Sequence, residues 1–314
     1  MNVKPVLGTM NFGPQVSLED SSEMVNIFLS SGFDDIDTAY VYNNGDSEKF
    51  LGHALKANDT PPVIATKVNP RITGKLNRQS IEDQIFESLE RLCVSSVDVL
   101  YLHFPDPNTP LHETLECCAD LHKKGYFKEL GLSNFPAWQV VHIWHICNSN
   151  GWPLPTVYQG LYNGLSRGVE PELLPALREL GMRFYAYNPL AGGILSGKYT
   201  DINNLQSGRF THRPNYQGRY WKKEFFDALN LIEAACNKYE ITIVEAAFRW
   251  LIDGSSLDGK LGDRIIIGAS SNEQLRQNLS FFGKPVLEKE ILQAFDDAWE
   301  ISKYESPAYF RNVG

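Results

Sequence analysis

Short apolar segments alternate with amphipathic segments along almost the whole chain. Eight of the apolar segments are near-continuous hydrophobic runs of strand length, which is typical of parallel strands buried on both faces. The sequence therefore predicts eight strands. They are expected at Val6–Met10, Phe33–Ile36, Val63–Thr66, Val97–Leu102, Glu129–Leu132, Thr156–Tyr158, Arg183–Tyr187 and Arg264–Ile267.

Helices are predicted between these strands from apolar residues at helical spacing and from start and stop signals. Ser17 with Asp20 predicts a capping box and Gly32 the end of the first helix, while Ser47 is expected to cap a second helix that runs to Ala57. Four more are marked by Ile81–Leu92, by Leu111–Leu121 before Gly125, by Trp138, Val141 and Trp144 before Gly151, and by Leu173–Leu180 before Gly181.

The seventh strand is followed by a long connection, Pro189 to Asp263. It is polar and aromatic up to about Trp221, and two helices are then expected at Glu224–Tyr239 and Val244–Ile252. Loops of this length are usually functional, so a lid over a ligand is favoured over a mere cover for the core. A last helix is expected at Lys289–Lys303.

Repeated alternation of strand and helix predicts parallel strands joined by crossover helices. We expect one domain, residues 1–314, folded as an α/β (β/α)8 TIM barrel with a long seventh loop and a C-terminal helix. A doubly wound sheet is the alternative fold. No G-x-G-x-x-G follows the first strand, so the dinucleotide fingerprint of that fold is missing.

The composition indicates which kinds of partner and which compartment to expect. The net charge is −9, which argues against the basic surface that nucleic-acid binding needs. Five cysteines without a C-x-x-C spacing predict free thiols in a reducing compartment. No apolar run approaches the length of a membrane span and no signal-peptide core is seen, so a soluble, cytoplasmic protein without a membrane partner is expected.

Polar residues follow the predicted strands at the points where the apolar runs end. In a barrel, these positions meet at one mouth, where such folds carry their function. They are Asp37–Tyr42, Lys67, His103, Ser133, Asn134, Gln159, Asn188, Pro189, Gly268, Ser270 and Ser271.

These residue types suit reduction of a carbonyl group. A carbonyl that accepts hydride needs a proton on oxygen, and a tyrosine can supply it although its free pKa is about 10. The ammonium of Lys67 would lower such a pKa, Asp37 would hold the lysine, and His103 would orient the carbonyl. The alternative for Asp37 and Lys67 is that they form a purely structural ion pair.

At this point a resemblance is evident. The segments DTAYVYNNGDSE (Asp37–Glu48), ATK (Ala65–Lys67), YLHFPD (Tyr101–Asp106), GLSNF (Gly131–Phe135) and YQGLYN (Tyr158–Asn163) resemble the aldo-keto reductase superfamily. The later segments Phe184–Tyr199, Gly208–Phe210, Arg219–Trp221, Gly268–Leu279 and Pro307–Arg311 are similar to its aflatoxin aldehyde reductase subgroup. The resemblance covers Gly8 to Arg311, nearly the whole chain.

The resemblance implies an NADPH-dependent reductase of aldehydes or ketones. The family's catalytic tetrad maps onto Asp37, Tyr42, Lys67 and His103, and the spacing from Asp37 selects Tyr42 rather than Tyr40 as the acid. Cofactor contacts map onto Ser133, Asn134, Gln159, Tyr187, Asn188, Pro189, Leu190, Gly192, Lys198, Arg209, Gly268, Ser270, Ser271, Gln274, Arg276 and Asn278. Substrate contacts by analogy are Tyr216, Arg219 and Arg311, the last of which would reach an acidic substrate.

Arg276, with Arg209, is expected to pair with the adenosine 2′-phosphate, which favours NADPH over NADH. Two departures from the subgroup, Asn43–Asn44 and Phe104, border the substrate and leave its identity open. Tyr40, Trp138, Trp144 and Trp152 are interpreted as packing residues, and Trp221 either lines the site or packs. His142 and His145 lack further ligands at metal-binding spacing, so no metal is expected.

Three functions remain open from the sequence. The first is a carbonyl reductase acting on a small molecule. The second is a nucleotide-binding regulatory subunit of a channel, a role that relatives on this fold have. The third is a biosynthetic reductase dedicated to one secondary metabolite. A homodimer is a further possibility that the resemblance implies.

Overall fold

Eight parallel strands form a closed barrel in sequence order, β1 to β8. The computed structural model describes residues 2–13, 15–56, 61–205, 209–212 and 214–311, with only the backbone at 209, 212, 214 and 215. The predicted TIM barrel is confirmed. The strands are β1 Lys4–Gly8, β2 Asp35–Asp37, β3 Val63–Val68, β4 Val97–Leu102, β5 Phe127–Ser133, β6 Pro155–Leu161, β7 Arg183–Tyr187 and β8 Arg264–Ile267.

Strand positions agree with the prediction, whereas several ends differ. Phe33, expected in β2, packs outside the barrel, with its ring centroid 5.7 Å from that of Phe28 and 6.2 Å from that of Phe282. Thr9 and Met10, expected in β1, follow the strand, although Thr9 N–H still donates to Asp37 O at 3.0 Å. Apolar character reports burial rather than strand pairing, which explains these shifts.

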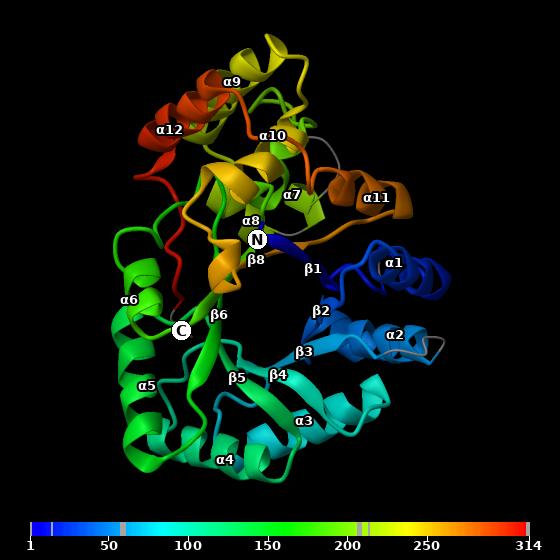
Figure 1. Cartoon of the computed structure of the whole chain (residues 1–314), viewed down its shortest axis with the longest axis vertical. Helices are drawn as coiled ribbons and strands as arrows, with labels where there is room; N and C mark the ends of the chain where they lie inside the picture. Colours follow the sequence, from blue (N-terminus) through cyan, green and yellow to red (C-terminus); the bar gives the residue numbers. More distant parts are fainter. Residues whose placement is uncertain (1, 14, 57–60, 206–208, 213, 312–314) are drawn as a thin grey trace.

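Helices surround the barrel on all sides of the view in Figure 1. Those between β1 and β7 are α1 Leu18–Ser30, α2 Asp46–Leu55, α3 Arg78–Leu92, α4 Leu111–Lys123, α5 Ala137–Asn150 and α6 Leu173–Glu179. Those after β7 are α7 Arg209–His212, α8 Pro214–Tyr220, α9 Lys223–Asn237, α10 Ile243–Arg249, α11 Asn272–Ser280 and α12 Lys289–Ser302. Short 3-10 turns lie at η1 Tyr42–Gly45, η2 Ala191–Ser196 and η4 Gly259–Leu261, and a π turn, η3 Trp250–Gly254, continues α10.

Two local signals had different outcomes. Ser17 caps α1 as predicted, because its hydroxyl accepts the N–H of Asp20 at 3.1 Å. Ser47 does not cap α2; the helix begins at Asp46, after Gly45 with φ of +90°. The Ser47 hydroxyl is buried and contacts Thr9 Oγ1 at 2.7 Å, so tertiary packing of the loop onto β1 displaced the expected cap.

Helix α5 buries a different face from the one its tryptophans mark. Trp138 is 65% exposed, which makes its assignment as a packing residue wrong, whereas Trp144 and Trp152 pack partly buried against the core. The buried face consists of Ala137, Val140, Ile143 and Cys147. Two apolar stripes at helical spacing run side by side here, and the smaller side chains allow the helix to lie closer to the strands.

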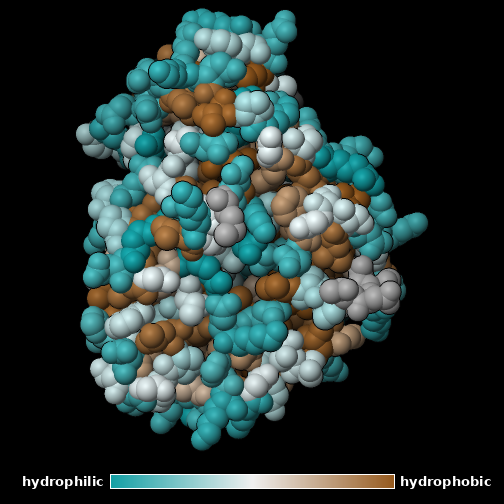
Figure 2. Space-filling view, in the orientation of Figure 1, coloured by the Kyte–Doolittle hydropathy of each residue, from teal (hydrophilic) through white to brown (hydrophobic). Residues whose placement is uncertain are grey.

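The hydrophobic core lies between the strands and the ring of helices, and a smaller apolar cluster fills the barrel interior. Figure 2 shows hydrophobic residues in small groups among hydrophilic ones on the face seen in Figure 1. No helix among the described residues is long and apolar enough to cross a membrane.

The long seventh connection folds over the barrel rather than standing apart from it. Trp221 packs: its ring lies 5.3 Å from Tyr199, 5.2 Å from Phe210 and 4.9 Å from Phe226, and its N–H donates to Ile202 O at 2.9 Å. Helices α9 and α12 pack together, and Figure 1 shows the C-terminal tail running from α12 back past β6. The tail is tied there by Arg311 N–H, which donates to Asn134 O at 3.0 Å.

Candidate active site

A buried ion pair forms the floor of one end of a large cavity at the C-terminal ends of the strands. Lys67 Nζ lies 2.6 Å from Asp37 Oδ2 and also donates to Thr38 O at 2.6 Å, with the lysine side chain fully buried. The other carboxylate oxygen of Asp37 accepts from Gln159 Nε2 at 2.7 Å. The Asp37 carboxylate therefore accepts from both Lys67 and Gln159, and this arrangement fixes the position of the Lys67 ammonium.

Burial acts on both partners of the pair. It raises the pKa of Asp37, against the lowering effect of Lys67, and it lowers the pKa of Lys67, against the raising effects of Asp37 and Glu48. Burial thus favours the neutral form of each group, and the charge of its partner favours the ionised form.

Tyr42 lies directly above this pair. Lys67 Nζ is 5.1 Å from the centroid of the Tyr42 ring, and the ring lies edge-on to His103 at 6.0 Å between centroids. Tyr42, Asp37 and His103 line the cavity, while Lys67 lies beneath its surface. The structure thus brings together all four residues of the predicted tetrad.

The loop that carries Tyr42 explains why two asparagines follow it. Asn43 and Asn44 have φ of +51° and +56°, a left-handed conformation that asparagine tolerates better than most residues. Asn43 Nδ2 also donates to Met10 O at 2.8 Å and to Phe12 O at 2.7 Å, which ties the loop to the segment after β1. This departure from the subgroup therefore has a structural role.

Tyr40 lies away from the cavity. Its hydroxyl donates to Glu87 at 2.6 Å, and the guanidinium of Arg91 lies 4.4 Å from its ring centroid. Of the two tyrosines, only Tyr42 lines the cavity.

His103 is held in a buried, positively charged setting. Its ring stacks on Phe104 at 4.7 Å, and Nδ1 lies 3.2 Å from Asn69 Nδ2. Burial holds its pKa well below the usual range, and the positive charges of Lys67, Arg71 and Arg311 add to this effect. The imidazole is therefore neutral at physiological pH and can donate a hydrogen bond without carrying charge.

Four residues form a polar and aromatic wall beside the tetrad. Ser133 and Gln159 are register partners on β5 and β6. Asn134, at φ of +66°, donates to Ser133 Oγ at 2.9 Å and accepts the Tyr187 hydroxyl at 2.8 Å. All four line the cavity, so the residues expected around a nicotinamide lie together.

The segment after β7 forms the next part of the wall. The predicted cofactor-binding residues of this segment all line the cavity, namely Asn188, Pro189, Leu190, Gly192 and Lys198. The Asn188 side chain accepts the Gly192 N–H at 2.8 Å and donates to the Tyr220 hydroxyl at 2.8 Å. Gly192 has φ of +71°, and a Cβ there would lie 2.9 Å from the rings of Tyr216 and Tyr220, so only glycine fits.

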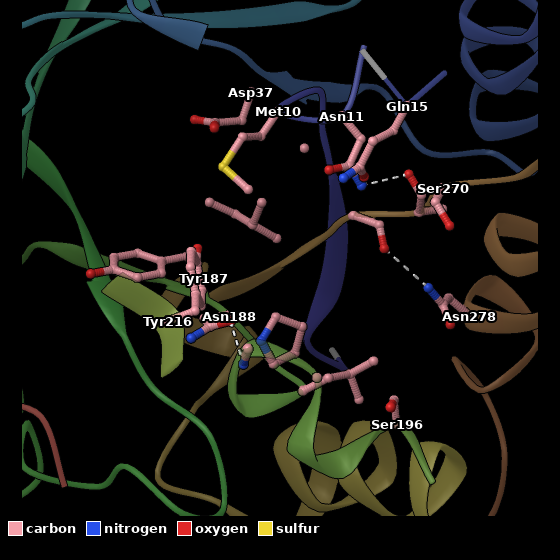
Figure 3. A pocket seen from close by; sticks show the side chains of 18 of the residues that line it. Met10, Asn11, Gln15, Asp37, Tyr187, Asn188, Ser196, Tyr216, Ser270 and Asn278 are labelled. Carbon is pink, nitrogen blue, oxygen red and sulfur yellow. Dashed lines mark hydrogen bonds between the residues drawn. The ribbon is translucent and has the colours of Figure 1, made fainter. Parts of the chain in front are cut away.

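The far end of the cavity is formed by the segment after β8. Figure 3 shows Ser270 and Asn278 across the cavity from Asp37 and Tyr187. Gly268, Ser270, Gln274 and Asn278 line it, whereas Ser271 caps α11 by accepting the Gln274 N–H at 3.3 Å. The Gln274 side-chain oxygen accepts both the N–H and the hydroxyl of Ser270, at 2.9 and 2.8 Å.

Arg276 does not line the cavity, so the structure does not place it beside the other residues predicted to hold the adenosine half. It lies on the outer face of α11, with Nη2 3.1 Å from Glu23 of α1 and its side chain 62% exposed. The physical reason is the helical turn: Arg276 falls on a different face from Gln274 and Asn278. The side chain of Arg209 lies outside the described residues.

The three residues predicted to contact the substrate line the same cavity as Tyr42. Tyr216, Arg219 and Arg311 all line the cavity, and the Arg219 guanidinium lies 5.2 Å from the Tyr216 ring centroid. Helix α8 of the seventh connection and the C-terminal tail thus both contribute side chains to the cavity wall.

Several cavity residues were missed by the sequence analysis. Met10, Asn11 and Gln15 follow β1, Asn69 and Arg71 follow β3, and Thr242–Val244 begin α10. Asn69 and Arg71 could have been found, because they continue the strand-end segment that starts at Lys67. The α10 residues carry no such signal, since their place depends on how the seventh connection folds.

The cavity has the dimensions and groups to hold a dinucleotide together with a small substrate. Its volume is about 1430 Å³ and it extends from the tetrad to α11. Asn11 Oδ1, on its wall, is buried without a hydrogen-bond partner among the described residues and is available to a ligand. The glycines after β7 leave a cradle that side chains would otherwise fill.

Comparison with known proteins agrees with this geometry. The sequence model of the aldo/keto reductase family matches residues 6–300. Aflatoxin B1 aldehyde reductase member 2 of Rattus norvegicus is 46% identical over 98% of this chain and 87% of its own length. Aldo-keto reductase family 7 member A3 of Homo sapiens is 45% identical over 98% and 96%, and oxidoreductase sirO of Leptosphaeria maculans is 37% identical over 97% and 96%.

A family model that spans most of the chain, relatives matched along nearly their full lengths, and a closed eight-stranded barrel all lead to one assignment. The chain belongs to the aldo/keto reductase family, in which it resembles the aflatoxin B1 aldehyde reductases, and it is an NADPH-dependent oxidoreductase that reduces carbonyl groups.

Proposed function

We propose that this enzyme reduces a small aldehyde or ketone with Tyr42 as the proton donor, His103 as the group that orients the carbonyl, and Lys67 and Asp37 as the charged support of Tyr42. The observation that carries the proposal is the buried Lys67–Asp37 pair, which lies beneath the Tyr42 ring beside a neutral His103. A purely structural ion pair would not explain why a phenol and an imidazole also lie at this end of a large cavity.

Bound NADPH supplies the hydride to the carbonyl carbon. Ser133, Asn134 and Gln159 offer hydrogen-bonding groups for its carboxamide, and Tyr187 offers a ring face whose orientation is fixed by its bond to Asn134. The backbone after β7, with Lys198, would hold the pyrophosphate, and the segment from Gly268 to Asn278 would hold the adenosine half.

The chain's own residues handle the proton. The Tyr42 hydroxyl donates to the carbonyl oxygen as negative charge develops there, and the nearby Lys67 ammonium stabilises the phenolate that remains. His103 donates a second hydrogen bond to the same oxygen and so aligns the carbonyl. Phe104, stacked on His103, excludes water from this side of the ring.

A panel of carbonyl substrates with NADPH and NADH side by side tests the function. We expect oxidation of NADPH with an activated aldehyde such as 4-nitrobenzaldehyde or succinic semialdehyde. Absence of turnover across aldehydes and ketones, together with retained nucleotide binding and co-purification with a membrane partner, would favour the channel-subunit alternative instead. Turnover restricted to one complex ketone would favour a dedicated biosynthetic reductase.

Lys198 rather than Arg276 is expected to contribute to cofactor binding. Lys198→Ala should raise the Kd for NADPH by about tenfold, the effect of losing one charge-assisted hydrogen bond. Arg276→Ala should change it by less than about threefold, because Arg276 contacts Glu23 outside the cavity. Quenching of protein fluorescence by NADPH measures both, and a larger loss in Arg276→Ala would contradict this placement.

A negatively charged substrate group would fit the mouth. Arg311 and Arg71 both line it, and neither contacts a carboxylate among the described residues. Burial, together with the nearby charge of Arg311, lowers the pKa of Arg71. We expect Arg311→Ala to raise KM for succinic semialdehyde by about tenfold and to leave KM for the neutral 4-nitrobenzaldehyde nearly unchanged. Equal changes for the two aldehydes would show that Arg311 does not recognise charge.

We further infer that residues 1–314 act as one domain, in the cytoplasm, on a small molecule and without a nucleic-acid partner. The continuous barrel core, the five free cysteines and the net charge of −9 support these points. A homodimer is proposed from the subgroup resemblance alone, and sedimentation of the purified enzyme tests it.

A further inference from the structure

Asn69, the residue that follows Val68 at the end of β3, lies between the backbone of Arg71 and the ring of His103. Its Oδ1 accepts the Arg71 N–H at 2.9 Å, and its Nδ2 lies 3.2 Å from His103 Nδ1. A backbone N–H can only donate, so the atom that faces Arg71 must be the amide oxygen. The NH2 group therefore faces His103. The contact with the Arg71 N–H thus fixes which side-chain atom of Asn69 is the oxygen and which is the nitrogen.

An NH2 group can only donate, so His103 Nδ1 must accept and carries no proton in the neutral ring. We propose that Asn69 is a positioning residue that holds His103 as the tautomer protonated on Nε2, the nitrogen left to donate to the substrate carbonyl. This inference rests on the proposed role of His103. It assigns a function to a residue outside the proposed tetrad.

The amide is itself held in place from the opposite side. Gln84 of α3 accepts the Asn69 N–H at 2.8 Å and donates to Asn69 O at 3.2 Å, and it also donates to Ser80 Oγ at 3.0 Å. Asn69 and Gln84 are each only 2% exposed. With its backbone and its oxygen both fixed, Asn69 has little freedom to turn its NH2 group away from His103.

The tautomer matters because the ring stays neutral. The charged groups that act on it are Lys67 from β3, Arg71 from the loop after β3 and Arg311 from the tail, and all three disfavour the imidazolium. On its other sides the ring meets Tyr42 and Phe104. A charged imidazolium would donate from both nitrogens, whereas a neutral ring donates from one, and Asn69 decides which.

The direct test observes the ring nitrogens of the wild-type enzyme. Nitrogen NMR of the ¹⁵N-histidine-labelled full chain, with the His103 signals identified by their loss in His103→Leu, reports which ring nitrogen carries the proton. We expect Nε2 to show the shift of a protonated nitrogen and Nδ1 that of a bare one, across neutral pH. A proton on Nδ1 in the wild-type enzyme would overturn the proposal.

The kinetic test uses Asn69→Asp, which keeps the shape of the side chain and replaces the donor with an acceptor. The carboxylate would still accept the Arg71 N–H, but it would require a proton on His103 Nδ1 and raise the pKa of the ring. Below that pKa the charged ring still donates from Nε2, and above it the neutral ring loses the Nε2 proton. We therefore expect kcat relative to wild type to fall as pH rises, by on the order of 100-fold, with NADPH binding unchanged.

A matched control introduces the same charge without touching the ring. Asn108 lies on an exposed turn and donates to Gly74 O at 2.8 Å, so Asn108→Asp should leave the pH profile as in wild type. An Asn69→Asp profile parallel to that of wild type would overturn the proposal. Failure of the proposed function is distinguishable, because His103→Leu would then retain full turnover whatever the tautomer.

Discussion

Tyr42→Phe is expected to lose turnover by about 10² to 10⁴-fold, the range of general acid catalysis, while it still binds NADPH. The phenyl ring keeps the packing against His103 and the position 5.1 Å above Lys67 Nζ, but it has no proton to donate. Steady-state NADPH oxidation measures the loss, and fluorescence quenching measures binding. A variant that turned over normally would mean that the proton comes from another group.

Tyr40→Phe is the matched control for this prediction. It removes a hydroxyl from the same loop, two residues away, but that hydroxyl donates to Glu87 outside the cavity. We expect turnover within about threefold of wild type, since a partly exposed hydrogen bond contributes only about 1 kcal/mol to stability. Equal losses in the two variants would indicate a disturbed loop rather than a missing acid.

Lys67→Met is expected to have the largest effect on stability. It leaves the Asp37 carboxylate buried without its partner, and breaking a buried ion pair in this way costs about 3–5 kcal/mol of unfolding free energy. Turnover should fall as well, because the cation beneath Tyr42 is lost. Urea denaturation at neutral pH measures the stability, and Lys128→Met is the control, since its pair with Asp98 is exposed to solvent and should contribute little to the free energy of unfolding.

The stability deficit of Lys67→Met should depend on pH. Burial already raises the pKa of Asp37 in the folded enzyme, and Lys67 opposes that rise, so its removal raises the pKa further. A carboxyl whose folded pKa is raised contributes stability at low pH, which is lost as pH rises through that folded pKa. The deficit should therefore shrink on acidification, and Asp37→Asn in the same chain should recover part of it at neutral pH. A deficit independent of pH would contradict this account.

The barrel itself could be predicted from the order of apolar and amphipathic segments, since eight buried strands separated by helices have few ways to close. The residues proposed for the tetrad could be predicted as well. Asp37, Lys67 and His103 lie at the C-terminal ends of β2, β3 and β4, Tyr42 lies in the segment after β2, and parallel strands bring these ends together at one side of the barrel. Asn69 and Arg71 lie beyond Lys67, the residue that directly follows the predicted strand Val63–Thr66. Their roles depend on the direction of single side chains.

The sequence by itself determined the fold and the family, because the fold follows from the order of apolar and amphipathic segments and the family from motifs that lie along the chain. It also predicted four residues for the catalytic site that the structure brings together. The tertiary structure decided what depends on neighbours distant in the chain. In the folded chain Arg276 of α11 contacts Glu23 of α1, and on α5 Trp138 is exposed whereas Val140 is buried. The Asn69 amide lies between Arg71 and His103. Helical spacing alone fits more than one face, and hydrogen-bond direction is set only when both partners are in place.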